Sequence, residues 1–284
     1  MKYAFIALHR LQFSVRTMCR LLRVHPSGFY AWLKAPLSKR AIEDRRQTEL
    51  LRSSWEDSGK VYGYRKLHDD LLDQGETCCP NRVARLTRLA GIKAQIGYKR
   101  RPGSYSGKPS VAVDNTLDRQ FDVEVPDKAW VTDITYIRTL EGFAYLAVVI
   151  DLYSRRVIGW ALQSRQATDV VLQALLSALW RRKPKQPVLV HSGSQFTSMD
   201  WAAFLKQHNL VHSMSRRGNC HDNAVVESFF NLLKRERIRR RVYRSREDAR
   251  RDVFDYIEMF YNPKRKHARN GMLSPIDFER QQKI

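Results

Sequence analysis

Hydrophobic residues in the N-terminal part of the chain recur at helical spacing. Val15, Met18, Cys19 and Leu22 stand at positions i, i+3, i+4 and i+7, which places them on one face of a helix. Residues 24–33 restart the pattern, with a proline near the first turn of a second predicted helix. Two short helices around a tight turn are typical of a helix-turn-helix, although a helical hairpin that only packs would give the same pattern.

A second pair of helices is predicted between residues 62 and 91. Three leucines share one face of the first helix, which Gly75 would end, and the second helix has Asn81 as a cap and Gly91 as a stop. Arg82, Arg85 and Arg88 recur every three residues along this second helix. Such a row suits phosphates or base edges of DNA, and an ordinary solvated helix face would look the same.

The pattern changes after a basic linker. Residues 97–115 are rich in Gly, Ser, Pro, Lys and Arg and lack periodicity. Three β-rich runs follow, separated by short turns, and predict an antiparallel meander over residues 129–138, 142–151 and 155–162.

Helices and strands alternate beyond the meander. A helix is predicted over residues 168–180, then a strand over 187–191, a helix over 199–209, a short strand over 210–215 and a long helix opening near Asp222. The order βββαβαβα is that of the ribonuclease-H-like fold, an α/β fold in which helices flank a mixed five-strand sheet.

Composition adds a candidate partner. The 284 residues include 51 Lys and Arg against 29 Asp and Glu, a net charge of +22 that self-repels unless it meets a polyanion. Residues 1–124 carry +10, residues 125–230 carry +4 and residues 231–284 carry +8. A nearly balanced middle between two basic flanks fits a catalytic core with parts that hold nucleic acid, although basic solvated surfaces would give the same distribution.

Cysteines and hydrophobic runs indicate the compartment. Cys19, Cys78, Cys79 and Cys220 lack paired metal-ligand spacing, so we expect free thiols in a reducing environment. No apolar segment has the length of a signal peptide or of a membrane span, and the protein is expected to be cytoplasmic and without a membrane partner.

Two acids stand where burial makes them costly. Asp133 lies in the middle of the first predicted strand, and Glu227 lies at the edge of the apolar face of the last predicted helix, with Lys234 seven residues further on. Such a helix stripe could hold a metal ligand and a phosphate-binding cation in line. The alternatives are an outward-facing or turn-bonded Asp133 and an ordinary exposed Glu227.

The chain resembles a known family over nearly its whole length. It is similar to the second-frame (OrfB) product of the insertion-sequence-three family of bacterial transposases and, more distantly, to retroviral integrases. The matching stretches, in order, are SVRTMCRLLRVHPSGFYAWLK, YGYRKLHDDL, WVTDITYI, LAVVIDLYSRRVIGW, GNCHDNAVVESFFNLLKRE and YNPKRKHARNGMLSPIDF.

The resemblance implies an acidic triad of two Asp and a Glu, with 35 residues between the last two acids. Asp133 and Glu227 match its first and last members, as ligands of Mg²⁺ or Mn²⁺, and Lys234 matches a phosphate contact. An active relative would bind the terminal inverted repeats of its element as a homo-oligomer, nick a strand and join it to target DNA. A first-frame (OrfA) protein is a further candidate partner, and a nucleoid-associated location is implied.

The family pattern is broken where the middle acid belongs. Members usually read His-Ser-Asp-X-Gly-Ser-Gln at this strand end, and this chain reads HSGSQ from His191 to Gln195. Since 34 residues separate Ser192 from Glu227, restoring Asp and one more residue after Ser192 would recreate the 35-residue spacing. We therefore interpret the second catalytic Asp as lost, with Asp151, Asp200 and His191 as weak candidates for replacing it.

The C-terminal segment is predicted as a basic helix, an aromatic helix and a turn at residues 262–263. Its aromatic residues are interpreted as packing rather than base-stacking groups. The basic residues that would track a phosphate backbone are Lys234, Arg235, Arg237, Arg239, Arg240 and Arg241.

Together these features predict a transposase, a metal-dependent DNA strand-cleaving and strand-joining enzyme, impaired in this copy. The competing interpretations are an inactive DNA-binding protein or repressor derived from a transposase, and a general nuclease of the same fold. The expected parts are a helix-turn-helix-like segment over residues 1–42, a second such DNA-binding module over 43–96, a basic linker over 97–120, the catalytic core over 121–236 and a basic helical extension over 237–284.

Overall fold

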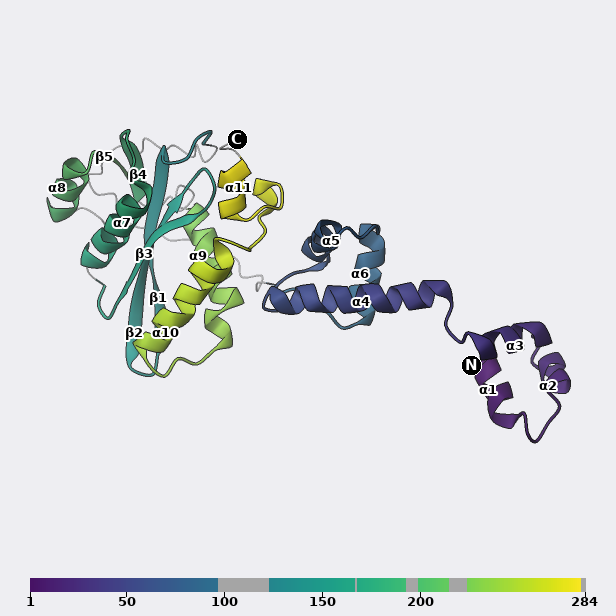
Figure 1. Ribbon diagram of the computed structural model, residues 1–284. Coiled ribbons are helices and arrows are strands. Elements are labelled where there is room, and N and C mark those ends of the chain that lie inside the picture. The colour runs from purple at the N-terminus through teal and green to yellow at the C-terminus, as the bar shows by residue number, and fades with distance from the viewer. Residues whose placement is uncertain (97–122, 167, 193–198, 215–223, 282–284) are drawn as a thin grey trace, which may run out of the picture. The chain divides into compact units, whose positions relative to one another are not determined.

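A computed structural model describes residues 1–284 except 97–122, 167, 193–198, 215–223 and 282–284. The chain forms two compact units, Met1–Lys93 and Ala94–Ile284, which we describe separately (Figure 1). In the described part of the chain, every helix falls short of the length and hydrophobicity that crossing a membrane requires.

Three short helices open the first unit. The predicted helices at its start are confirmed as α2 and α3, and Pro26 occupies the first turn of α3. A preceding helix, α1, was not predicted, because its apolar residues follow one another without helical spacing. A buried cluster of one or two side chains from each helix, including Ile6 and Phe29, holds the three together. Their bounds are α1 Lys2–His9, α2 Val15–Leu21 and α3 Pro26–Lys34.

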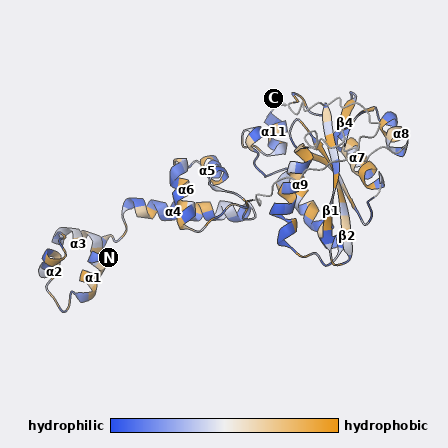
Figure 2. Ribbon diagram, turned by 180° about the vertical axis from the view of Figure 1, so that it is seen from behind, coloured by the Kyte–Doolittle hydropathy of each residue, from blue (hydrophilic) through white to orange (hydrophobic). Residues whose placement is uncertain are grey.

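The rest of the first unit is a long helix and the second predicted helix pair. The long helix α4 has a buried stripe that includes the polar residues Gln47 and Ser54, which explains why a hydrophobic pattern does not reveal it (Figure 2). Gly75 and Gly91 follow α5 and α6 with φ of +81° and +69°, as predicted for helix stops. The prediction for Asn81 is wrong, because Cys79 is the cap residue and Pro80 begins the helix. The bounds are α4 Lys39–Asp57, α5 Tyr64–Asp73 and α6 Pro80–Leu89.

A five-strand mixed sheet forms the centre of the second unit, as predicted. Its order is β3-β2-β1-β4-β5, in which β3, β2 and β1 are antiparallel neighbours and β4 and β5 continue parallel to β1. The meander and the two later strands therefore form one sheet, in which β1 lies between β2 and β4. The bounds are β1 Ala129–Thr139, β2 Gly142–Asp151, β3 Val157–Gln163, β4 Val188–Ser192 and β5 Leu210–Met214.

Helices cover both faces of this sheet (Figure 1). One face packs under α7 (Thr168–Arg182) and α8 (Met199–Gln207), with Trp130 and Trp201 in a fully buried cluster. Helix α7 approaches β3 so closely that a Cβ at Gly159 would come within 2.2 Å of the Ala174 carbonyl oxygen. The other face packs under α9 (Ala224–Glu236) and α10 (Arg246–Phe254).

The C-terminal segment differs in part from its prediction. The basic run is not one helix, because α9 ends at Glu236 and a short 3₁₀ turn, η2, follows. Glu236 is buried there and accepts hydrogen bonds from Tyr256 and Arg265, which hold the end of α9 inside the unit. Tyr256, Phe260 and Tyr261 are buried, so the packing role predicted for them is confirmed. The remaining elements are η2 Ile238–Arg240, the π-helical η3 Asp255–Tyr261, η4 Ala268–Asn270 and α11 Pro275–Gln281.

Candidate active site

Asp133 lies on the sheet face that α9 covers. It pairs with Val148 across β1 and β2. Trp130 and Ile134 are an even number of residues apart on β1, share one face of the sheet and belong to the core under α7. Because successive side chains point to opposite faces, Asp133 points to the other face. The side chain is partly buried, and its Oδ1 accepts a hydrogen bond from the Ile134 amide at 2.8 Å. The strand thus carries a carboxylate into the interface between the sheet and α9.

Glu227 meets Asp133 from the first turn of α9. The buried residues of this helix, among them Val226 and Phe230, face the sheet and leave Glu227 exposed at the edge of the interface. Burial raises the pKa of Asp133 to about 6, against the hydrogen bond from Ile134, and the negative charge of Glu227 raises it further. The structure therefore brings together the two acids that the sequence singled out.

Lys234 completes this group, which we call the β1–α9 site: Asp133, Glu227 and Lys234. Its Nζ lies 5.0 Å from the centre of the Tyr136 ring on β1. Burial lowers the pKa of Lys234, repulsion from Arg239 adds to this effect, and attraction to Asp133 opposes it. A half-buried ammonium group near the Asp133 carboxylate is suited to neutralise a phosphate that approaches this site.

Strand β4 ends beside this site. Ser192, its last residue, is in parallel register with Thr132, the residue before Asp133. A residue that continued the register by one step would lie next to Asp133, on the same face of the sheet. The sequence places Gly193 after Ser192, and the turn from Gly193 to Ser198 lies outside the described residues. The expected position of the second acid is thus at the end of β4, where this chain has a glycine.

The candidates for replacing that acid are engaged or placed elsewhere. Asp151 is fully buried and binds Arg182. His191 is buried and shares a hydrogen bond of 3.0 Å with Ser213, while Asp200 is exposed on α8, over the opposite face of the sheet. Among the residues that the structure describes, no group of three or more His, Cys, Asp or Glu side chains is placed to hold a metal ion.

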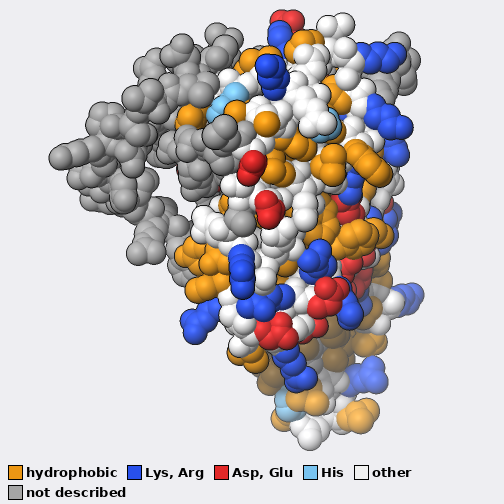
Figure 3. All heavy atoms as spheres, turned by 90° about the vertical axis from the view of Figure 1, so that its left-hand side faces the viewer, with side chains coloured by type: hydrophobic (Ala, Val, Ile, Leu, Met, Phe, Trp, Pro, Cys, Tyr) orange, Lys and Arg blue, Asp and Glu red, His pale blue; other side chains and the backbone are white. Residues whose placement is uncertain are grey.

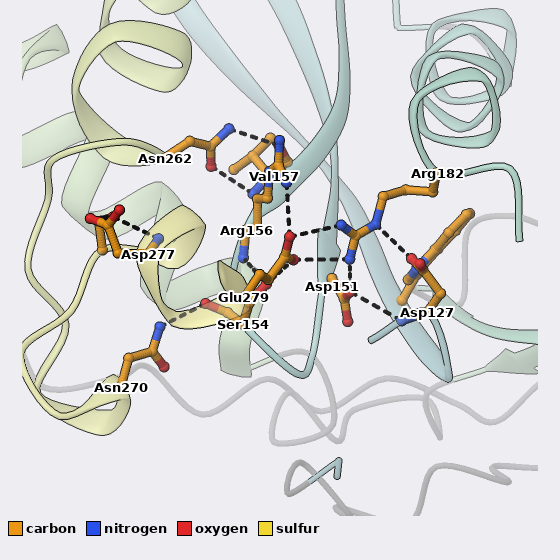
Figure 4. A network of polar contacts seen from close by, with 12 residues as sticks. Asp127, Asp151, Ser154, Arg156, Val157, Arg182, Asn262, Asn270, Asp277 and Glu279 are labelled. Atoms are coloured by element: carbon orange, nitrogen blue, oxygen red, sulfur yellow. Dashed lines mark hydrogen bonds and ion pairs between the residues drawn. The ribbon is translucent and has the colours of Figure 1, made fainter. Parts of the chain in front are cut away.

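A second charged cluster, which the sequence did not reveal, joins four distant segments (Figure 4). Arg182 at the end of α7 binds Asp127, Asp151 and Glu279, with Nε 2.7 Å from Asp127 and Nη1 2.9 Å from Glu279. Arg156 adds a second guanidinium 2.8 Å from Glu279. We call these five residues the Arg182 cluster. Its members lie up to 152 positions apart, so no local pattern relates them.

The arginines predicted to contact DNA have different surroundings. Arg82 and Arg85 on α6 bind Asp44 of α4 at 2.8 and 2.6 Å, and Arg88 is exposed. Arg235 is partly buried, with Nη2 3.6 Å from Glu236. On the face drawn in Figure 3, basic side chains are interspersed with acidic and hydrophobic ones. The positive charge on that face is therefore spread out.

Comparisons with known proteins cover nearly the whole chain. Two integrase core domain families match residues 124–220 and 227–282, and an HTH-like domain family matches residues 42–101. The transposase InsF for insertion sequence IS3A of Escherichia coli (strain K12) is 43% identical over 283 residues, which are 98% of each chain. An uncharacterized 31 kDa protein of insertion element IS600 of Shigella sonnei is 33% identical over 92% of this chain and 97% of its own.

A solved structure is also similar. A chain in a complex described as a simian T-cell lymphotropic virus intasome with a PP2A regulatory subunit has a TM-score of 0.45 and 14% identity, over 76% of this chain and 74% of its own.

Proposed function

Because the chain belongs to the family of IS3 insertion-sequence transposases, with a ribonuclease-H-like integrase core, we propose that it recognises insertion-element DNA but cleaves and joins strands poorly. The observation that supports the catalytic part is the meeting of Asp133 and Glu227 at the β1–α9 site. The observation that supports the impairment is the glycine after Ser192, where the register of β4 leads to Asp133.

The acids of the β1–α9 site fit one divalent ion in part. Carboxylate oxygens are preferred ligands of Mg²⁺ and Mn²⁺. The negative charges of Asp133 and Glu227 repel each other, and a bound cation would relieve this repulsion. A bound ion would supply charge neutralisation and activation of oxygen for phosphoryl transfer. Asp133 and Glu227 would hold it, and Lys234 would orient the scissile phosphate.

Two carboxylate ligands, Asp133 and Glu227, are too few for strand cleavage and joining. Strand cleavage and joining in this superfamily are in-line transfers that rely on two metal ions, and the missing acid would hold one of them. A loss of ~4 kcal/mol in transition-state stabilisation slows a reaction about a thousandfold. We infer that the chain as it stands binds DNA with little strand cleavage.

DNA binding itself would use both units. We place the exposed Arg88 of α6 against phosphate. Arg82 and Arg85 would reach phosphates only by giving up their ion pairs with Asp44. Arg235 would extend the basic side of α9. The DNA partners are the terminal inverted repeats and the target, bound by a homo-oligomer with or without an OrfA protein.

The deciding experiment repairs the strand end. Purified protein is incubated with a labelled element end and Mg²⁺ or Mn²⁺ in three forms: the chain as it stands, the chain with Asp-Gln inserted after Ser192, and a matched control with Asn-Gln inserted there. We expect nicking from the Asp-Gln form alone, because only that insertion restores both length and charge. Equal nicking by the unaltered chain would show that strand cleavage does not need an acid after Ser192.

A DNA-binding protein or repressor derived from a transposase is the second candidate, favoured by the same missing acid. If all three forms bind the element end and none nicks it, this function replaces the first. Equal cutting of unrelated DNA by the Asp-Gln form would instead indicate a general nuclease.

A further inference from the structure

Two exposed aromatic rings lie side by side on the hairpin of β1 and β2. Tyr136 is 58% exposed and Phe143 is 46% exposed, and their ring centres are 5.3 Å apart in an edge-to-face arrangement. The partly buried Tyr145 lies opposite Tyr136, and the exposed Arg138 lies opposite Phe143, so the four side chains share one face of the sheet. We call these four residues the hairpin platform.

The platform lies beyond the part of this face that α7 covers. The core under α7 includes Ile134 and Ala147, which form the cross-strand pair next to Tyr136 and Tyr145. Neither platform ring that is exposed belongs to that core. Each ring therefore keeps an apolar surface that packing within the unit does not use, and that a flat ligand could cover.

Hydrogen bonds to the segment around α10 hold the hairpin in place. The Arg246 guanidinium donates to the Glu141 carbonyl oxygen at 2.8 Å and to the Phe143 carbonyl oxygen at 3.1 Å. The Leu140 amide donates to the Tyr243 carbonyl oxygen at 3.0 Å. The rings thus project from a fixed backbone, which lowers the entropy cost of binding a ligand to them.

Lys234 links the platform to the β1–α9 site. Asp133 and Tyr136 point to opposite faces of the sheet, because they are three residues apart on β1. In the described part of the chain, β4 follows β1 only as far as Thr132, so this edge of β1 has no strand partner until a single bridge at Thr139. Lys234 lies at this open edge, since its ammonium group is attracted to Asp133 and lies 5.0 Å from the centre of the Tyr136 ring.

The chemistry of the platform fits a single strand of DNA. Bases stack on exposed aromatic rings whatever their sequence, and guanidinium and ammonium groups pair with phosphates. Arg138 and Lys234 supply these cations beside the rings, while Glu141, the acid of the hairpin turn, accepts a hydrogen bond from the Arg246 amide at 2.9 Å. An acidic protein partner would match the cations, but a strand of bases and phosphates matches the rings as well.

We propose that the hairpin platform binds an unpaired DNA strand next to the β1–α9 site, with bases stacked on Tyr136 and Phe143 and a phosphate at Arg138. Asp133 and Tyr136 are ~10 Å apart along β1, so one strand can contact Lys234 and the platform together. The strand must be unpaired, because bases inside a duplex are covered by their neighbours. This proposal rests on the proposed function, which brings DNA to the β1–α9 site.

Comparison of two oligonucleotides tests the proposal on the full chain. Binding of a fluorescent dT₁₂ and of a twelve-unit abasic strand of the same charge is measured by anisotropy. We expect the unaltered protein to prefer dT₁₂ by roughly tenfold or more, the equivalent of at least one stacked base. Tyr136→Thr combined with Phe143→Thr removes both rings while keeping residues that favour strands, and should remove most of this preference. Affinity for the abasic strand should stay the same.

Matched variants control for folding and for aromatic residues in general. Tyr136→Phe combined with Phe143→Tyr keeps both rings and should keep the preference, and thermal unfolding checks that all variants fold. Trp180→Gln removes a ring that is 76% exposed on α7, outside the platform, and should leave the preference intact. For the phosphate contact, Arg138→Gln should lower the slope of log affinity against log salt by ~0.7, whereas Lys185→Gln, at an exposed residue after α7, should not.

The outcomes separate this proposal from the function it builds on. If the unaltered protein binds both oligonucleotides equally, or if the variant without the two rings keeps the wild-type preference, the platform is refuted and the transposase assignment stands. An equal loss of affinity for both oligonucleotides in that variant would also refute base stacking. If the protein binds neither oligonucleotide, nor double-stranded element ends, both proposals fail.

Discussion

Asp133 on β1, which is partly buried, and Asp151 on β2, which is fully buried, are aspartates on neighbouring strands with opposite surroundings. Burial raises the pKa of each to about 6. Asp151 binds Arg182 and accepts hydrogen bonds from the amides of Asp127 and Tyr153 at 3.1 and 3.0 Å. Near Asp133, by contrast, a second carboxylate raises the pKa further, and the cation is the partly desolvated Lys234.

The difference shows that a raised pKa alone does not mark a functional acid. The Arg182 cluster satisfies its carboxylates from within the protein, and it ties α11 to the end of α7, which is a structural task (Figure 4). The β1–α9 site places like charges together, so its acids are best satisfied by a cation from outside. The partners of a buried acid, rather than its burial, distinguish the two roles.

The largest expected effect is on the Arg182 cluster. Arg182→Met removes the cation that Asp151, Asp127 and Glu279 share, and should destabilise the second unit by ~3–5 kcal/mol, because carboxylates remain buried without it. Urea unfolding followed by tryptophan fluorescence measures the change. Arg181→Met is the matched control, since this neighbouring residue is 39% exposed and pairs with the partly buried Glu258, and its loss should cost ~1 kcal/mol or less. Equal losses would contradict a structural role specific to Arg182.

A smaller effect of opposite sign is expected at the β1–α9 site. The pKa of Asp133 is raised in the folded protein, so protonation of this group favours folding. The stability that protonated Asp133 contributes to the folded state is full below about pH 4 and is lost as the pH rises through about 6. Asp133→Asn should therefore stabilise the second unit by ~2 kcal/mol at pH 7.5 and have almost no effect near pH 4.

Urea midpoints of wild type and Asp133→Asn across this pH range measure that difference, which cancels the titration of all other groups. Asp169→Asn, at an exposed acid in the first turn of α7, serves as the control for the loss of one carboxylate charge. A destabilised Asp133→Asn at pH 7.5 would place Asp133 with the structural acids.

Divalent ions should raise the free energy of unfolding by about 1 kcal/mol through the β1–α9 site. Mn²⁺ at a few times its dissociation constant raises the free energy of unfolding by roughly this amount when it binds only the folded state. We expect this gain at pH 7.5 in the wild type, and its absence when Asp133→Asn and Glu227→Gln are combined. Calorimetric unfolding with and without Mn²⁺ provides the measurement. An unchanged gain in the double variant would mean that the ion binds elsewhere.

The smallest expected effect concerns α6, where Asp44 satisfies two arginines as Arg182 satisfies its acids. The hydrogen bond from Arg85 is the main cause of the lowered pKa of Asp44, which therefore stays ionised at neutral pH. Asp44→Asn should release Arg82 and Arg85 toward phosphate and steepen the salt dependence of duplex binding by up to ~2 in log–log slope. Asp57→Asn, an exposed acid on the same helix, controls for net charge. Identical slopes would show that these arginines reach DNA with Asp44 in place, or not at all.

Much of the fold was predictable because local periodicity reports local structure. Helices α2, α3, α5 and α6 and all five strands follow patterns of apolar residues or glycine stops. Helix α4 escaped, because two of its three buried residues are polar, and Asn81 was misassigned because Pro80 takes the first helical position. The basic run after Glu236 was predicted as helical, but α9 ends at Glu236, whose side chain forms a buried ion pair with Arg265.

The sequence by itself determined the strand and helix order, the family, the basic character of the flanks and the absence of an acid after Ser192. These are properties of neighbouring residues or of ordered matches along the chain. The tertiary structure decided which charges meet: Asp133 with Glu227, Asp151 with Arg182, and Arg82 and Arg85 with Asp44. Electrostatic interactions depend on distance and burial in space, so side chains that lie far apart in the sequence acquire their roles only when the sheet and its helices pack.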